Sequence, residues 1–210
     1  MGVSIHYRGK LDNKDRLPAL RNALAGIAST LGWQCLVLDE DWSTPANAIL
    51  THQGKIAEIE GHLGLKGIQL SPPGKSESLD FFFDSEGNLL SPMSIVLIQE
   101  GVLAPDDAWI SLKTQFLSPE MHVFIIGLLK YIKEHHIPNL EVRDEGEYWE
   151  TGDYQNLKKK MEVIDKKLDY LSRELSSVCS GEPGSLSVDE IAARIEFLLH
   201  AEELKSRSIN

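Results

Sequence analysis

Apolar and polar residues alternate in two segments of the chain that begin about 105 positions apart. Residues 5–11 (Ile-His-Tyr-Arg-Gly-Lys-Leu) and residues 110–116 (Ile-Ser-Leu-Lys-Thr-Gln-Phe) share this alternation, and each carries a basic residue near its centre. A period of two is typical of a strand that buries one face. We therefore expect one strand over residues 4–11 and a second strand that begins near Trp109.

Each of these segments is followed by the pattern of an amphipathic helix. Apolar residues recur at spacings of three and four over residues 15–31, and again after Ser118-Pro119, a pair that is typical of a helix start. The apolar run 34–39 then predicts a central strand. Residues 140–143 form its counterpart in the second half.

Both of these second strands end in Asp-Glu with a tryptophan close behind. This common order predicts a unit used twice, with repeat 1 at about residues 1–91 and repeat 2 at about 109–153. We expect an α+β fold in which two pseudo-repeated strand–helix–strand units share one mostly antiparallel, curved sheet with helices on one face. Residues 1–153 would form this sheet domain.

The middle of the chain gives a mixed signal. Strands are expected over residues 67–70, 79–83 and 88–90, with a hairpin turn at 84–87. Three adjacent phenylalanines lie in the second of these strands, and only alternate ones can face one side. Residues 43–65 and 92–104 do not show a pattern that defines their structure.

The last part of the chain is expected to form a helical hairpin over residues 154–210. Six apolar residues at alternating spacings of four and three predict a long helix over 154–176 with a heptad-like seam: Leu157, Met161, Ile164, Leu168, Leu171 and Leu175. A capping box at residues 187–190 predicts a final helix to about residue 204. The seam is covered either by that final helix or the sheet, or by self-association through residues 154–204.

Composition and charge narrow the classes of function. The 210 residues carry a net charge of −11, and residues 51–108 hold three basic against nine acidic side chains. Nucleic-acid binding is therefore unlikely, because a surface that follows phosphates needs clustered Lys and Arg. No apolar stretch is long enough for a membrane span. With two cysteines in unlike surroundings and no secretory pattern, we expect a cytoplasmic protein, with Cys35 in the core.

The acidic run Leu140–Asp153, together with the duplicated order of strand, helix and antiparallel strands, resembles an uncharacterised bacterial family with a TATA-box-binding-protein-like fold. In such folds two repeats form one curved sheet with helices on its convex face. The TATA-binding proteins carry basic residues and phenylalanine wedges on the concave face. Because this chain is acidic in its middle, the resemblance implies the fold and does not imply DNA binding.

Candidate functional residues lie in the two clusters of acidic and aromatic side chains at the strand ends. Converging carboxylates could bind a divalent cation or perform acid–base chemistry, and the aromatic rings could anchor a partner. A solvated acidic strand end with a tryptophan folded onto the core is the structural alternative. The candidate binding residues are Asp39, Glu40, Trp42, Asp144, Glu145, Tyr148, Trp149 and Glu150.

Two functions follow as hypotheses. The first is a non-catalytic binding or interaction module for a protein partner, because the chain contains no recognisable nucleotide-binding, zinc-protease or serine-hydrolase motif. It implies no catalytic residue, no metal ligand and no cofactor. The alternative is a metal-dependent hydrolase or phosphoryl-transfer enzyme that sets Asp39 and Glu40 against Asp144 and Glu145.

Overall fold

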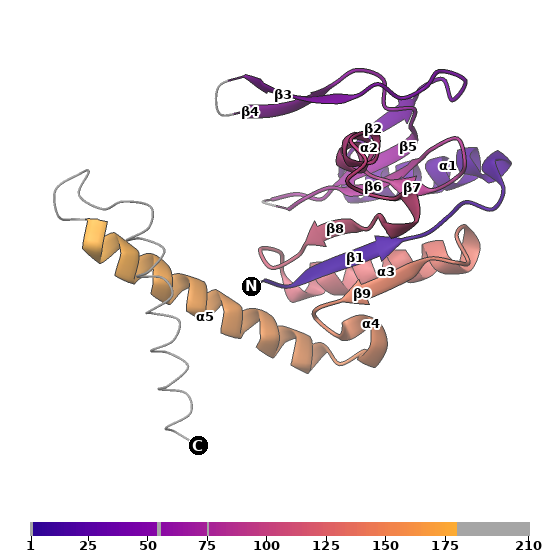
Figure 1. Ribbon diagram of the computed structural model, residues 1–210. Helices are drawn as coiled ribbons and strands as arrows, with labels where there is room; N and C mark the ends of the chain where they lie inside the picture. The colour runs from indigo at the N-terminus through magenta and orange to yellow at the C-terminus, as the bar shows by residue number, and fades with distance from the viewer. Residues whose placement is uncertain (1, 54–55, 75, 180–210) are drawn as a thin grey trace. The chain divides into compact units, whose positions relative to one another are not determined.

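The computed structural model describes residues 2–53, 56–74 and 76–179 (Figure 1). The chain divides into two compact units, residues 1–161 and 162–210. The helices and strands, in chain order, are β1 (Ser4–Arg8), the short helix η1 (Lys14–Arg16), α1 (Leu17–Leu31), β2 (Gln34–Asp39), β3 (Ile49–Gln53), β4 (Ile56–Glu60), β5 (Lys66–Ser71), β6 (Leu79–Phe83), β7 (Leu89–Leu90), α2 (Pro92–Gln99), η2 (Pro105–Asp107), β8 (Ile110–Lys113), α3 (Pro119–His135), β9 (Glu141–Asp144), α4 (Tyr148–Thr151) and α5 (Tyr154–Cys179).

Strand β1 is the middle strand of an antiparallel sheet of order β8-β1-β9. His6 lies opposite Ser111 on one side and opposite Arg143 on the other. The alternation in the sequence predicts that β1 buries one face. Ile5 and Tyr7 are indeed fully buried, whereas Ser4, His6 and Arg8 are only partly buried.

A second antiparallel sheet has the order β2-β5-β6-β7. Backbone hydrogen bonds join it to the segment that follows β1, from Leu11 N to Gly87 O at 2.8 Å and from Leu89 N to Gly9 O at 3.0 Å. The fold is therefore mixed α+β with antiparallel strands, as predicted, but the single shared sheet that we expected is divided into separate sheets. The pseudo-repeat is not confirmed, because β8 and β9 both flank β1 whereas β1 and β2 belong to different sheets.

The prediction that residues 34–39 form a central strand is wrong. Strand β2 lies at an edge of its sheet and pairs with β5 alone. Its apolar residues Leu36 and Val37 are 52% and 45% exposed. The placement of Cys35 in the core is also wrong, because this cysteine is free and exposed. An apolar composition does not by itself bury a strand, since burial depends on what packs against it.

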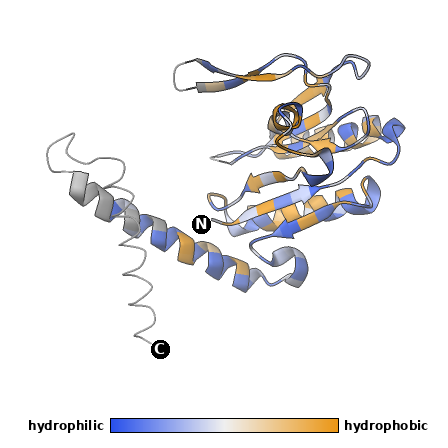
Figure 2. Ribbon diagram, in the orientation of Figure 1, coloured by the Kyte–Doolittle hydropathy of each residue, from blue (hydrophilic) through white to orange (hydrophobic). Residues whose placement is uncertain are grey.

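Two cores lie on opposite faces of the four-stranded sheet. Phe81 and Phe83 belong to the larger core, which also contains the apolar faces of α1, α3 and the three-stranded sheet. Phe82 points the other way, into a smaller core with Ile95 and Val96 of α2. The three phenylalanines thus divide between two faces, as the period of a strand requires. Figure 2 shows apolar residues recurring along the strands and helices that build these cores.

The two segments without a clear sequence pattern contain regular structure. Residues 49–60 include the paired strands β3 and β4, and residues 92–99 form α2. Ser91 caps α2 by accepting a hydrogen bond from the backbone N–H of Ser94 at 3.1 Å. Helix α2 covers the sheet face opposite α1 and α3, so not all helices lie on one face.

Helix α5 confirms the predicted long helix and begins at the predicted residue. Its first two seam residues, Leu157 and Met161, are buried within the first unit. Residues 162–179 continue the helix in the second unit. The side chains of Leu168, Leu171 and Leu175, and the final helix expected over residues 187–204, lie outside the described residues. Within the described part of the chain, no helix has the length and apolarity needed to cross a membrane.

Candidate functional site

The first candidate cluster lies at the end of β2 and is bound by basic side chains of its own unit. The Asp39 carboxylate lies 3.2 Å from Lys66 Nζ and 3.6 Å from Arg21 Nη1. The hydrogen bond and charge of Lys66 hold the pKa of the Asp39 carboxyl below its usual value. This carboxylate is therefore already partnered on a solvated surface.

Glu40 and Trp42 tie the loop after β2 to neighbouring strands. Glu40 Oε2 accepts a hydrogen bond from the backbone N–H of Leu65 at 3.1 Å, and the indole N–H of Trp42 donates to the backbone O of Phe83 at 3.2 Å. The ammonium group of Lys66 lies 5.1 Å from the centre of the Trp42 ring. These contacts favour a structural role for this cluster.

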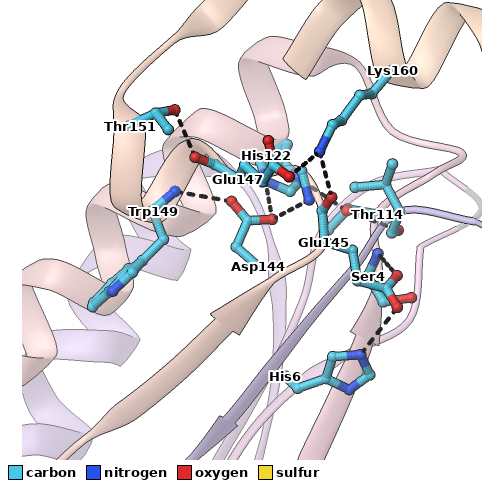
Figure 3. A network of polar contacts seen from close by, with 12 residues as sticks. Ser4, His6, Thr114, His122, Asp144, Glu145, Glu147, Trp149, Thr151 and Lys160 are labelled. Atoms are coloured by element: carbon cyan, nitrogen blue, oxygen red, sulfur yellow. Dashed lines mark hydrogen bonds and ion pairs between the residues drawn. The ribbon is translucent and has the colours of Figure 1, made fainter. Parts of the chain in front are cut away.

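The second candidate cluster contains a buried polar chain that the sequence does not reveal (Figure 3). The Asp144 and His122 side chains are both fully buried, and Asp144 Oδ1 lies 3.1 Å from His122 Nε2. On its other side, His122 Nδ1 lies 2.8 Å from Thr114 Oγ1. Thr114 Oγ1 also donates to the backbone O of Val3 at 3.1 Å, which leaves this hydroxyl to accept from His122. The contact between Nε2 and the carboxylate is then attractive only when Nε2 carries a hydrogen.

Two backbone groups complete the environment of Asp144. Its carboxylate accepts hydrogen bonds from the N–H of Gly146 at 2.7 Å and from the N–H of Trp149 at 3.0 Å. Burial acts to raise the pKa of the Asp144 carboxyl, but the contact with His122 and these two bonds outweigh it and hold the pKa below its usual value. Because Thr114 is also buried, this chain resembles a hydrolytic triad only in composition, and no substrate could reach its hydroxyl.

Glu145 and its neighbours continue this network to the surface. Glu145 Oε2 accepts a hydrogen bond from the backbone N–H of Ser4 at 2.8 Å, and His6 Nε2 lies 3.7 Å from Oε1. Lys160 of α5 pairs with Glu147 at 2.8 Å and lowers the pKa of that carboxyl by its hydrogen bond and charge. Figure 3 shows these side chains meeting at the ends of β1 and β9.

The other candidate residues of this cluster are less constrained. Tyr148 and Trp149 are partly buried against the larger core, and Lys130 Nζ lies 5.5 Å from the centre of the Trp149 ring. Glu150 is exposed on α4. The tryptophans at residues 42 and 149 thus both lie on the core, as the structural alternative expects.

The structure does not bring the two acidic clusters together. Asp39 and Glu40 belong to the edge strand β2 and the loop after it, whereas Asp144 ends β9, an edge strand of the other sheet, and Glu145 follows it. Within the described residues, no group of three or more His, Cys, Asp or Glu side chains could hold a metal ion. An enzyme that opposes these four carboxylates therefore has no support from their placement.

A different set of side chains forms an open polar surface on the three-stranded sheet. The register places alternate residues of the three strands on the side opposite the larger core. Trp109, immediately before β8, joins them through its contact with Arg8. We call this surface the outer face, and it consists of Ser4, His6, Arg8, Trp109, Ser111, Lys113, Glu141, Arg143 and Glu145.

Two arginines of the outer face converge on the ring of Trp109, at one corner of this surface. The guanidinium carbon of Arg8 lies 4.7 Å from the centre of the Trp109 ring, and that of Arg143 lies 4.3 Å from it. Arg8 is fixed further by Glu141, whose two carboxylate oxygens each lie 3.0 Å from its Nη2. In contrast, the side chains of Arg143 and Lys113 form no ion pair with a carboxylate among the described residues, although the backbone N–H of Lys113 donates to Glu77 Oε2 at 2.6 Å.

Two hollows flank the Arg8–Trp109 contact. One, of about 220 Å³, is lined by Arg8, Lys10 and Asn139 among others. The other, of about 430 Å³, is lined by Trp109, Ser111 and the buried Asp80 among others. Burial raises the pKa of the Asp80 carboxyl, although hydrogen bonds from Gln69 and Ser78 oppose the rise. The outer face is thus a mixed polar and aromatic surface with a hollow on each side of the Arg8–Trp109 contact, and binding sites commonly lie at such hollows.

Sequence reasoning missed both His122 and the outer face. His122 stands alone in the sequence, and its partners arrive from β9 and from the loop after β8. The basic side chains of the outer face were visible as polar members of alternating strands. Their convergence on Trp109 depends on strand order, which no local pattern contains.

Comparisons with protein-family models, with curated proteins and with solved structures found no match for this chain. The resemblance to TATA-box-binding-protein-like folds therefore stays a prediction.

Proposed function

We propose that this chain is a non-catalytic binding module that docks a protein partner on the outer face. The observation that carries this proposal is the stack of Arg8, Trp109 and Arg143 on an open sheet surface. Tryptophan and arginine are the residues most enriched at the energetic centres of protein interfaces. Here their geometry is fixed by the strands, so little ordering is needed when a partner binds.

The charge of the outer face favours an acidic partner segment. The side-chain charges of Arg143 and Lys113 have no ion-pair partner among the described residues, whereas Arg8 is held by Glu141. A partner carboxylate could pair with Arg143 while an apolar or aromatic side chain packs beside Trp109. A long phosphate backbone fits less well, because Glu141 and Glu145 stand on the same face and the whole chain is acidic.

The test is selection of ligands from a peptide library of mixed charge, followed by binding measurements with variants. We expect acidic peptides to be selected and Trp109→Ala to weaken their binding at least about tenfold, the loss typical of an anchor residue. Arg143→Glu should weaken binding by a similar factor. Lys159→Glu is the matched control, because it makes the same charge change at an exposed position of α5. Unchanged affinity in both outer-face variants, or preferential binding of nucleic acid, would overturn the proposal.

A further inference from the structure

Strand β2 has one edge that is hydrogen-bonded to β5 and one that pairs with no strand among the described residues. The backbone N–H of Glu40 donates to Leu65 O, and the register of β2 with β5 pairs Leu36 with Gln69. Because an antiparallel strand bonds in alternate directions, its even-numbered residues face β5. The backbone N–H and C=O groups of Cys35, Val37 and Asp39 therefore point away from the sheet.

The side chains beside this free edge are apolar and exposed. Leu36 is 52% exposed and Val37 is 45% exposed, and they lie on opposite faces of the strand. Exposed edges are normally blocked by charges, prolines or bulges. The one charged residue of β2, Asp39, is instead paired with Lys66 and Arg21 at the end of the strand. Nothing along its centre discourages pairing.

We propose that β2 pairs antiparallel with β2 of a second copy of this chain, about a two-fold axis at Leu36. The outward-pointing residues of one strand must pair with those of the other, which restricts the register. With the axis at Leu36, Leu36 lies opposite the partner's Leu36, and Cys35 lies opposite the partner's Val37. Cys35, Leu36 and Val37 then each meet an apolar residue, and Leu38 lies opposite the partner's Gln34. An axis at Val37 would instead set the carboxylate of Asp39 against the partner's Cys35.

Helix α1 leaves room for this approach. Arg21 of α1 contacts Asp39 of β2, so Arg21 lies on the side of α1 next to the free edge. Because residues four apart share one side of a helix, the same side carries residues 25 and 29. These are Ala25 and Ser29, both small. A second copy can therefore extend the sheet beside β2 without meeting a bulky helix face. Such a contact is self-complementary, as a two-fold interface requires, and it uses a surface separate from the outer face.

Disulfide trapping tests both the contact and its register. The full chain with Cys35→Ser and Cys179→Ser would carry Leu36→Cys in one variant and Val37→Cys in a matched control. At the proposed axis, residue 36 faces its own copy as a non-hydrogen-bonded pair, a spacing that permits a disulfide. We expect mild oxidation to give a covalent dimer with Leu36→Cys and not with Val37→Cys. Cross-linking of the control alone, or of neither variant, would overturn the register or the contact.

Light scattering gives a second, independent measurement. At about 50 µM, above a micromolar dissociation constant, we expect the natural chain to have twice the mass of one copy. Val37→Lys should return a folded monomer because it places a charge on the free edge. Ile49→Lys, at an exposed position of β3 outside this edge, should leave the mass doubled. A monomeric natural chain, or a Val37→Lys variant that still dimerises, would count against the proposal.

Discussion

Asp144 lies in a buried polar network of the first unit. Its carboxylate meets a buried histidine and two backbone N–H groups, and no solvent shares these contacts. Removing one member of this buried set leaves the remaining polar groups without a hydrogen-bond or charge partner. The resulting loss of stability is larger than the net stabilisation that the complete set provides. Substitution of Asp144 is therefore expected to lower the free energy of unfolding strongly.

We predict that Asp144→Asn lowers the free energy of unfolding by about 3 kcal/mol at pH 7, the lower end of the range for breaking a buried pair. The amide keeps the size of the side chain but loses the charge that His122 faces. Urea unfolding measures this loss. Glu58→Gln, which removes a charge at an exposed position of β4, is the control and should change stability by less than about 0.5 kcal/mol.

The same variant has a defined dependence on pH. Because the pKa of Asp144 is lower in the folded state than in the unfolded chain, its stabilising contribution is complete above about pH 4 and is lost as the pH falls through the folded pKa. The difference in stability between the natural chain and Asp144→Asn should therefore shrink on acidification. A difference that stays constant between pH 7 and pH 3 would contradict this assignment.

At this scale the sequence drew attention to some residues of the buried network but did not predict their contacts. Asp144 was a candidate because it lies in an acidic run, yet its importance comes from burial beside His122. That contact joins residues 22 positions apart through the packing of α3 against β9. Trp109 and Arg143 were not candidates, because only the strand order places them together.

Among the elements, the pair β5 and β6 depends on a close backbone approach at Gly67. This residue has a φ of +150°, and a Cβ placed on it would lie 2.0 Å from Phe81 O. Both facts exclude a larger residue without movement of one strand. Since β6 is buried on both faces, such a movement would disturb both cores.

We predict that Gly67→Ala destabilises the chain by about 4 kcal/mol or more, in the range reserved for severe packing defects. Gly26→Ala is the matched control, because a Cβ on this helical glycine would meet no atom within 4 Å. That change should stabilise α1 by roughly 0.5–1 kcal/mol through its helix propensity. Chemical unfolding of the two variants measures both effects, and similar results for both would refute the steric argument.

Elements with a strong period were predicted well. The apolar stripes predicted α1 and α3, Ser118-Pro119 marked the start of α3, and the turn at Gly87 predicted the hairpin of β6 and β7. Strand β2 was misassigned because its composition describes only its own residues. Its exposure follows from its position at the sheet edge, which is set by β5 and by the absence of a further strand beside it among the described residues.

At the scale of the whole molecule, the first compact unit ends within α5. Leu157 and Met161 are buried in it, and the backbone O of Met161 accepts a hydrogen bond from Gln115 Nε2 at 3.2 Å. The boundary between the two units lies between residues 161 and 162, immediately after these contacts. A unit that includes these two residues has its own core and should fold without the remainder.

We predict that a chain ending at residue 165 folds cooperatively, whereas Leu157→Ala in the full chain costs about 2–5 kcal/mol, as for other buried leucines. Val163→Ala, at a position 44% exposed beyond the boundary, should cost far less. Thermal or urea unfolding followed by circular dichroism compares the three. A shortened chain without a cooperative transition would show that residues after 165 are needed for the first unit.

Strand β1 is the middle strand of its sheet and is also the earliest of the three to be synthesised. The last of its partners to be made, β9, ends at residue 144, which is 136 residues after the end of β1 at residue 8. At the usual speed of synthesis, roughly 5–20 residues per second, β1 waits about 7–27 seconds for this partner. For the first 105 residues of that interval, until β8 ends at residue 113, no strand of its own sheet lies beside β1. The growing chain therefore exposes the apolar face of β1 before its partner strands exist. A chaperone that binds this strand on the ribosome should raise the yield of folded protein.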